Sequence, residues 1–360
     1  MLPVAAAFPL VWAAAPSRLA AAFVSAGYFL AGSFDLPRGV ANFYGHGSGA
    51  GICFWFVASL SFVAVHTALW TRRSGWKKAL RYAVAAVLMS IPPFGILGWG
   101  HPLTAAGIVF PGWGWWGLTA MATILLAMTT RAWWVAAVVV GLLSLRSAWL
   151  WTDPVTPENW TGIQTSFGSG ADQDLALSQQ LETLEMVRAA GNDGAKVVVL
   201  PESALGMWTP TIERLWVRSL AGHDLTMLAG AILVNETGYD NVILQITNAG
   251  ATVVYRQRMP VPISMWQPWQ GWWGLPTGVT ANPLANPTFE LGMVRVAPLI
   301  CYEQLLVWPV LQSAWHAPDA IVAIANGWWT RGTSILEVQQ ASTVAWAKLF
   351  DLPLILSAND

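Results

Sequence analysis

One cysteine and two glutamates follow apolar runs in a pattern that suits thiol chemistry. Cys301 comes directly after the run VAPLI, and Glu303 lies two residues beyond it. Glu202 ends a second run, VVVLP. A thiol is only partly ionised at neutral pH, so a nucleophilic cysteine needs a base beside it. We therefore predict that Cys301 is a nucleophile activated by a carboxylate. The alternative is a small core residue, the role expected of Cys53.

These runs are predicted strands, and their order along the chain resembles that of a known protein superfamily. After the Pro-Glu and Cys-Tyr-Glu strand ends come the run AIVAIA with Asn326-Gly327-Trp328, a helix and the closing strand LILSAN. This series, over residues 158–360, resembles the carbon–nitrogen hydrolase (nitrilase) superfamily. Within it, the chain is most similar to apolipoprotein N-acyltransferase and its plasmid-encoded relatives in conjugation. The resemblance implies a four-layer α-β-β-α sandwich.

The resemblance also implies roles for the acidic residues. Glu202 matches the family's general base, and Glu303 matches its supporting acid. Taken alone, Glu202 could instead be an exposed acid at a strand end. Glu303 could be a carboxylate that complements a helix N-terminus.

The chain departs from the family pattern at the catalytic lysine. That position holds Gln257, within the segment YRQR, and Met265 replaces a further acid. Arginine can bind an oxyanion but cannot give up a proton. Alternate residues of a strand share a face, so Arg256 and Arg258 should point together, away from Gln257. A one-residue bulge would turn an arginine into the site instead.

Hydrophobic periodicity predicts that helices and strands alternate through the second half, residues 151–360. Helices are expected at residues 174–190, 211–220 and 333–350. Strands are expected at residues 160–166, 225–234, 241–247, 251–256, 294–300 and 321–325.

The first half, residues 1–150, is predicted to be a transmembrane domain of five or six helices. Before Trp151 there are nine of the 18 Lys and Arg residues but only one of the 19 Asp and Glu residues. No charged residue occurs at 39–71 or 82–130, whereas a span needs about 20 apolar residues. Spans are expected at residues 2–15, 19–34, 49–71, 79–98, 103–130 and 132–150. The first is short for a crossing, so the alternatives are a re-entrant or interfacial segment and an uncleaved signal anchor. Pro92-Pro93 should break the fourth span.

Basic residues predict the orientation of the spans. Arg72, Arg73, Lys77, Lys78 and Arg81 lie in one short loop, which should face the cytoplasm. Alternation then places the second half outside the cytoplasmic membrane. The resemblance implies the periplasmic side of a bacterial inner membrane.

Tryptophans near the span ends indicate an interfacial belt. Four further tryptophans crowd a loop of the second half, which we interpret as a membrane-dipping lid or a groove for an acyl substrate: Trp266, Trp269, Trp272 and Trp273.

Three functions remain open. The first is an acyltransferase in which Cys301 accepts an acyl group from a phospholipid and passes it to an amine, such as a lipoprotein N-terminus. The second is a non-catalytic assembly component that contacts other conjugation proteins, and the third is a membrane-tethered amidase. The scattered histidines and cysteines predict no metal site, no cofactor is expected, and the second half has no basic patch for direct nucleic-acid contact.

Overall fold

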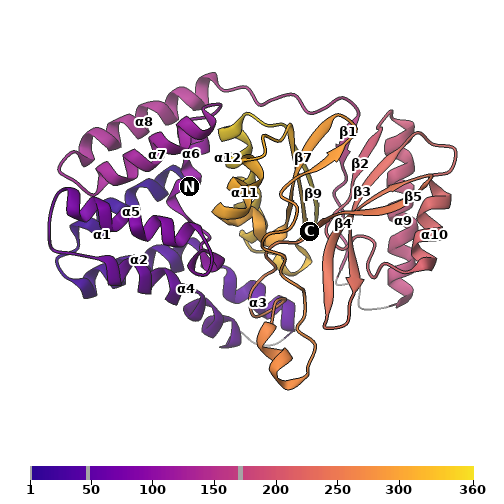
Figure 1. Cartoon of the computed structure of the whole chain (residues 1–360), viewed down its shortest axis with the longest axis horizontal. Coiled ribbons are helices and arrows are strands. Elements are labelled where there is room, and N and C mark those ends of the chain that lie inside the picture. The colour runs from indigo at the N-terminus through magenta and orange to yellow at the C-terminus, as the bar shows by residue number, and fades with distance from the viewer. Residues whose placement is uncertain (1, 46–48, 169–172) are drawn as a thin grey trace. The chain divides into compact units, whose positions relative to one another are not determined.

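The computed structural model describes residues 2–45, 49–168 and 173–360, which divide into two compact units. The first is helical and contains Met1–Pro154, Leu305–Leu311 and Gly332–Leu352. The second contains Val155–Gln304, Gln312–Arg331 and Pro353–Asp360. Both β-sheets and every candidate site residue belong to the second unit (Figure 1).

In the helical unit, two helices are long and apolar enough to cross a membrane: α4 (Gly49–Leu69) and α8 (Trp133–Leu150). A third candidate is the pair α2 (Arg18–Gly32) and α3 (Leu36–Tyr44), which bends by 52° at its break. The remaining helices are shorter: α1 (Phe8–Ala14), α5 (Trp76–Ser90), α6 (Ala106–Val109), α7 (Gly114–Met128) and α12 (Ile335–Phe350).

Two of the predicted membrane spans differ in the structure. One is shorter than predicted, and the other is divided into two helices. α5 ends at Ser90, before Pro92-Pro93, as the prolines predicted. The single helix expected at 103–130 is instead split into α6 and α7. α6 packs so closely on α12 that a Cβ on Gly107 would lie 1.6 Å from the Ala345 carbonyl oxygen. The break itself falls at residues 110–113, where Pro111 and Gly112, with a φ of +76° at the glycine, end the helix. The expectation that Cys53 is packed inside was also wrong, because it lies on an exposed face of α4.

The second unit is built on two sheets. Sheet A has the order β1-β2-β3-β4-β5 and sheet B the order β6-β7-β8-β9. β1, β2 and β3 are parallel, as are β7, β8 and β9, so their carboxyl ends gather at one edge of each sheet. The bounds are β1 (Trp160–Gly162), β2 (Val197–Val199), β3 (Thr226–Val234), β4 (Tyr239–Thr247), β5 (Gly250–Arg256), β6 (Phe289–Leu291), β7 (Val294–Ile300), β8 (Ala320–Asn326) and β9 (Leu354–Asn359).

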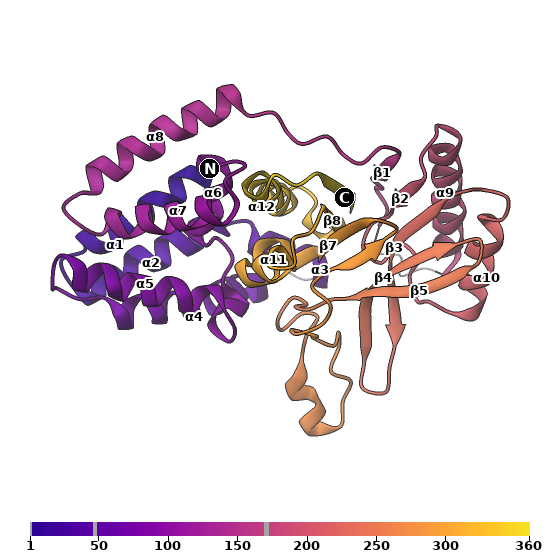
Figure 2. The same ribbon diagram turned by 45° about the horizontal axis from the view of Figure 1, so that its top comes forward.

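Apolar cores hold these layers together. α9 (Gln173–Asn192) and α10 (Pro210–Ser219) cover one face of sheet A (Figure 2), where Val187 and Trp216 pack against Val198. On the other face, Leu228 and Ile243 belong to a core shared with sheet B. The predicted strands and helices of this half are thus confirmed within a few residues. α11 (Val307–Ala314) and α12 follow β7 and β8 in the chain, but most of their residues belong to the helical unit.

Candidate active site

Cys301 stands at the carboxyl end of β7, where the chain enters a short 3-10 helix (Cys301–Leu305). Its φ of +50° lies in the left-handed region that residues other than glycine seldom adopt. Ser203, directly after Glu202, has a φ of +58°. Such conformations cost about 1–3 kcal/mol each and cluster at functional sites. Both turns that carry the predicted reactive groups are therefore held by their surroundings in an unfavourable backbone conformation.

The packing of sheet A on sheet B brings Glu202 to Cys301. Glu202 follows β2, and its carboxyl group is hydrogen-bonded to the thiol of Cys301. Its Oε1 accepts a hydrogen bond from Asn241 Nδ2 at 2.5 Å, and its Oε2 accepts one from the Asn326 backbone N–H at 2.9 Å. Both side chains are buried, with Glu202 only 3% exposed. The predicted base and the predicted nucleophile are thus hydrogen-bonded to each other.

Burial controls the protonation of this pair. It raises the pKa of Glu202 to about 7, against the opposing effect of its hydrogen bonds to Cys301, Asn241 and Asn326. Burial, followed by the charge of Glu202, also raises the pKa of the Cys301 thiol well above its usual value. A charged group in an apolar interior is disfavoured unless an opposite charge compensates it. The resting pair is therefore a thiol beside a carboxyl group that titrates near neutrality.

This arrangement predicts a pH dependence for Cys301. Only the carboxylate form of Glu202 can accept the thiol proton, so the rate of acylation should rise about tenfold per pH unit below about 7 and level off above it. The rate of Cys301 modification by a neutral acyl ester, followed by mass spectrometry, measures this profile. In Glu202→Gln the plateau should disappear. An unchanged profile in that variant would exclude Glu202 as the base.

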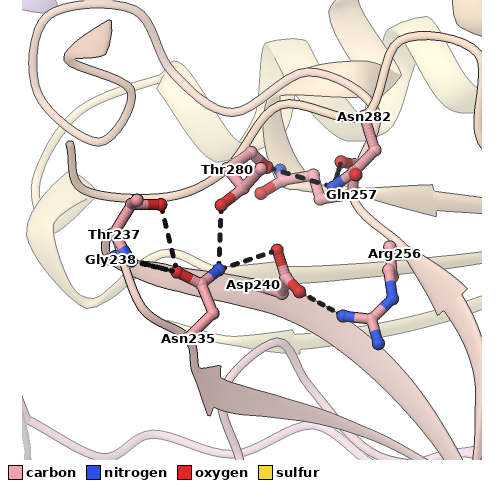
Figure 3. Close-up of polar contacts among 8 residues, drawn as sticks. All are labelled: Asn235, Thr237, Gly238, Asp240, Arg256, Gln257, Thr280 and Asn282. Carbon is pink, nitrogen blue, oxygen red and sulfur yellow. Dashed lines mark hydrogen bonds and ion pairs between the residues drawn. The ribbon is translucent and has the colours of Figure 1, made fainter. Parts of the chain in front are cut away.

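Gln257 lies directly beyond β5, with its side chain inside the site. Its Oε1 accepts from Asn241 Nδ2 at 3.1 Å, and its Nε2 donates to the carbonyl of Ile300, the residue before Cys301, at 3.1 Å. Its backbone carbonyl is fixed from the other side by Asn282 (Figure 3). Fully buried, Gln257 places a neutral amide where the resemblance expects an ammonium group.

Arg256 and Arg258 both avoid the Glu202–Cys301 pair. The guanidinium of Arg256 extends to the carboxylate of Asp240 (Figure 3). The guanidinium of Arg258 is buried and donates to the Tyr255 hydroxyl, the Pro298 carbonyl and the hydroxyl of Ser313, with a further bond to Gln312. A register shift in the β4–β5 pairing lies between Ile243 and Leu244, yet it leaves both arginines away from Cys301.

Glu303 is buried, and its carboxylate accepts hydrogen bonds from several segments of the site. Its carboxylate accepts hydrogen bonds from the Tyr255 hydroxyl, from the backbone N–H groups of Arg258 and Met259, and from that of Ile300. Burial raises its pKa, while the nearby Arg258 charge and these donors lower it. Glu303 therefore links the end of β5 to the end of β7, and so fixes Gln257 relative to Cys301.

Comparison with known proteins agrees with this architecture. The Carbon-nitrogen hydrolase family matches residues 217–348. Conjugal transfer protein TraB of Agrobacterium fabrum is 51% identical over all of this chain and 88% of its own length. The probable conjugal transfer protein TraB of Sinorhizobium fredii is also 51% identical, over all of this chain and 92% of its length. The chain belongs to the TraB family of conjugal transfer proteins.

Solved structures are more distant from this TraB-family chain. An amidase of the nitrilase superfamily from Nesterenkonia is 12% identical, with a TM-score of 0.41 over 57% of this chain and 79% of its own. A carbon–nitrogen hydrolase from Helicobacter pylori is 13% identical, with a TM-score of 0.39 over 55% of this chain and 72% of its own.

Two adjoining cavities lie in this part of the TraB-family chain, and Glu202 lines the first of them. The first, of about 260 Å³, has a mixed polar and apolar lining that includes Glu202 and Asn326. The second, a more apolar groove of about 420 Å³, shares Met207 and Ile232 with the first and extends to Pro276. The four predicted groove tryptophans do not line either cavity among the described residues. Trp266 and Trp269 are half-buried, and Trp272 and Trp273 are exposed on the projecting segment η4 (Pro268–Trp273) (Figure 2).

Sequence reasoning missed two residues of this TraB-family site. Asn241 contacts both Glu202 and Gln257 but lies on β4, with no motif around it. Tyr255 stands out in the sequence only as a neighbour of the lysine position, although its hydroxyl donates a hydrogen bond to Glu303. The alternation of side chains does indicate that Tyr255 faces the site, because it shares a strand face with Gln257 and should point inward with it.

Proposed function

We propose that this TraB-family chain is a membrane-bound thiol acyltransferase. Cys301 would take an acyl group from a phospholipid as a thioester and pass it to an amine. The observation that carries this proposal is the hydrogen bond between the buried carboxyl group of Glu202 and the Cys301 thiol, formed by residues 99 positions apart on two different sheets. A structural cysteine has no need of a carboxyl partner.

The first step follows from this contact. Glu202 accepts the thiol proton as the sulfur attacks the ester carbonyl, so the S–C bond forms while the ester C–O bond breaks. The leaving alcohol takes the proton from Glu202. Backbone N–H groups of Tyr302 and Asn326 are hydrogen-bonded to the Cys301 sulfur, where they stabilise the developing thiolate. The carbonyl oxygen of the intermediate would have to find neutral donors, because Gln257 stands in the lysine position.

The apolar groove supports a long-chain donor. Met207, Ile232, Val234 and Pro276 give it a largely hydrocarbon lining, and its volume of about 420 Å³ falls in the usual range for ligand sites. It leads toward a segment, residues 259–289, that contains no charged residue. The exposed Trp272 and Trp273 of that segment suit contact with a lipid interface, where tryptophan is favoured.

A trapping experiment tests this function. Purified chain in vesicles of phospholipid with isotope-labelled acyl chains should accumulate a label on Cys301 that hydroxylamine removes, as a thioester requires. Long-chain esters should exceed short amides as donors. Faster turnover of short amides would support an amidase instead. Val234→Asp should slow long-chain donors and spare an acetyl donor, which separates groove binding from chemistry.

We further propose that the helical unit crosses the bacterial inner membrane several times and that the second unit faces the periplasm. The basic residues at 72–81 support this orientation. Reporter fusions after Ser74 should therefore be active in the cytoplasm, and fusions after Pro157 in the periplasm. The reverse pattern at either position would remove the periplasmic assignment.

A second candidate, a non-catalytic component of the conjugation apparatus, is favoured by one observation. Gln257 is fully buried and both ends of its amide are hydrogen-bonded, so the lysine position has been adapted to a neutral side chain. Such a protein would keep the fold for assembly with other conjugation proteins. Absence of any acyl-Cys301 in the trapping experiment would favour this candidate.

A further inference from the structure

The cavity of mixed lining beside Glu202 is suited to a positively charged ligand. Among the described residues that line it, Glu202 alone carries a charge. The wall is otherwise made of apolar groups and of side chains with neutral oxygen atoms, including Thr165, Gln180, Asn326 and Asn359. A cavity of about 260 Å³ with this lining offers acceptors and one anion, and it would disfavour a phosphate or a carboxylate.

Glu202 itself lacks a compensating charge. Its donors are the amide of Asn241, the backbone N–H of Asn326 and the thiol of Cys301, all of them neutral. None of the ion pairs in the described part of the chain includes it. A buried carboxylate without a cation is costly, and the usual remedy is a partner of opposite charge.

Asn241 provides an independent sign that a donor is missing. It is 2% exposed, and its Oδ1 has no hydrogen-bond partner among the described residues. Buried side-chain oxygens are nearly always paired, so an orphaned one calls for an explanation. Asn241 contacts Glu202 but is not among the described residues that line the cavity, so of the two only the Glu202 carboxylate offers its acceptors to a ligand there.

We propose that this cavity binds a primary ammonium group, which supplies the positive charge that Gln257 does not. A primary ammonium offers three donors and no acceptor, which matches the acceptors of the cavity. The inference rests on the proposed acyltransferase function, in which the amine acceptor would be that ligand. The acceptor would thus assist its own reaction, because its charge keeps Glu202 ionised for the attack by Cys301.

The second half-reaction balances with the same groups. The ammonium gives one proton to the Glu202 carboxylate and becomes a free amine. Its nitrogen attacks the thioester carbonyl, so the N–C bond forms while the C–S bond breaks. The Cys301 thiolate takes the second proton from the nitrogen, which leaves an amide and a thiol. Glu202 then releases its proton to water.

Small alkylammonium ions test this site without the natural acceptor. The readout is the rate of Cys301 alkylation by neutral iodoacetamide, in a Cys53→Ala background and at a pH about one unit below the Glu202 midpoint. An adjacent cation lowers a carboxyl pKa by about 1–3 units, so ethylammonium chloride should accelerate alkylation up to about tenfold over sodium chloride. Tetramethylammonium, which has no N–H donor, should not. Equal rates in all three salts, or equal acceleration by tetramethylammonium, would overturn the proposal.

Variants localise the effect. Ala204→Leu, on the cavity wall, should remove the ethylammonium acceleration, whereas the matched Ala221→Leu on an exposed turn should keep it. If Cys301 does not react in any salt, the proposed function fails but the site can still be measured. In Cys301→Ala, ethylammonium should then raise the melting temperature relative to sodium, and adding Glu202→Gln should abolish that rise. No rise in Cys301→Ala would exclude ammonium binding.

Discussion

Replacement of Cys301 by alanine is expected to abolish acyl labelling of the chain. In a Cys53→Ala background, Cys301 is the sole thiol, so a long-chain activated ester should label the parent and leave Cys301→Ala at background. The background substitution matters because Cys53 is exposed on α4 and could react on its own. Intact-mass spectrometry after hydroxylamine treatment measures the loss. Persistent label in Cys301→Ala would point to a different nucleophile.

A conjugation assay with the same variant separates chemistry from scaffolding. If DNA transfer falls together with labelling, the thioester is what the cell uses. If transfer is complete without the thiol, the fold alone serves conjugation. Glu202→Gln is the matched control, because it keeps the shape of the side chain and removes only the base. Loss of a general base typically costs about a hundred- to ten-thousandfold in rate, so this variant should behave nearly as Cys301→Ala.

The placement of Cys301 and Glu202 could be predicted because the ends of strands can be recognised in a sequence. Both residues follow short apolar runs, and parallel strands in each sheet gather their carboxyl ends at one edge. The alternation of side chains along a strand also predicted that Arg256 and Arg258 point away from the side of Gln257. The structure confirms this for Arg256, which pairs with Asp240 while Gln257 contacts Asn241 and Ile300. For Arg258 the prediction was wrong, because β5 ends at Arg256 and the alternation stops there, so the Arg258 side chain is buried against the Tyr255 hydroxyl.

Other features could not be predicted, for physical reasons. Asn241 becomes a site residue only because the antiparallel pairing of β3 and β4 sets it opposite Ile232, beside the turn that carries Glu202. That is a matter of register, which no local motif encodes. The close contact between Gly107 of α6 and the Ala345 carbonyl of α12 joins residues more than 200 positions apart. Hydropathy describes one segment at a time and contains no information on a packing partner that is distant in the sequence.

Substituting lysine for Gln257 should increase thioester formation by about a hundred- to a thousandfold. That factor is what a single oxyanion donor typically contributes to an acyl-transfer rate. The ammonium group would compensate the Glu202 charge and so lower the pKa of that carboxyl from about 7. It would also offer a donor to the orphaned Oδ1 of Asn241. The pH profile of Gln257→Lys should accordingly shift toward acid, with its plateau reached at lower pH.

Gln257→Met is the control for this gain, because it has a similar length and no charge or N–H donor. It should form thioester no faster than the parent.

An arginine acting as the oxyanion donor would give the opposite pattern: Gln257→Lys would change little, while Arg256→Ala would abolish labelling. The structure argues against that outcome, since the Arg256 guanidinium is engaged by Asp240. Arg258→Ala is less informative on its own, because it also removes the hydrogen bond to Tyr255 that helps to position Glu303. A Gln257→Lys variant with the parent's rate and pH profile would therefore show that a missing cation is not what limits this site.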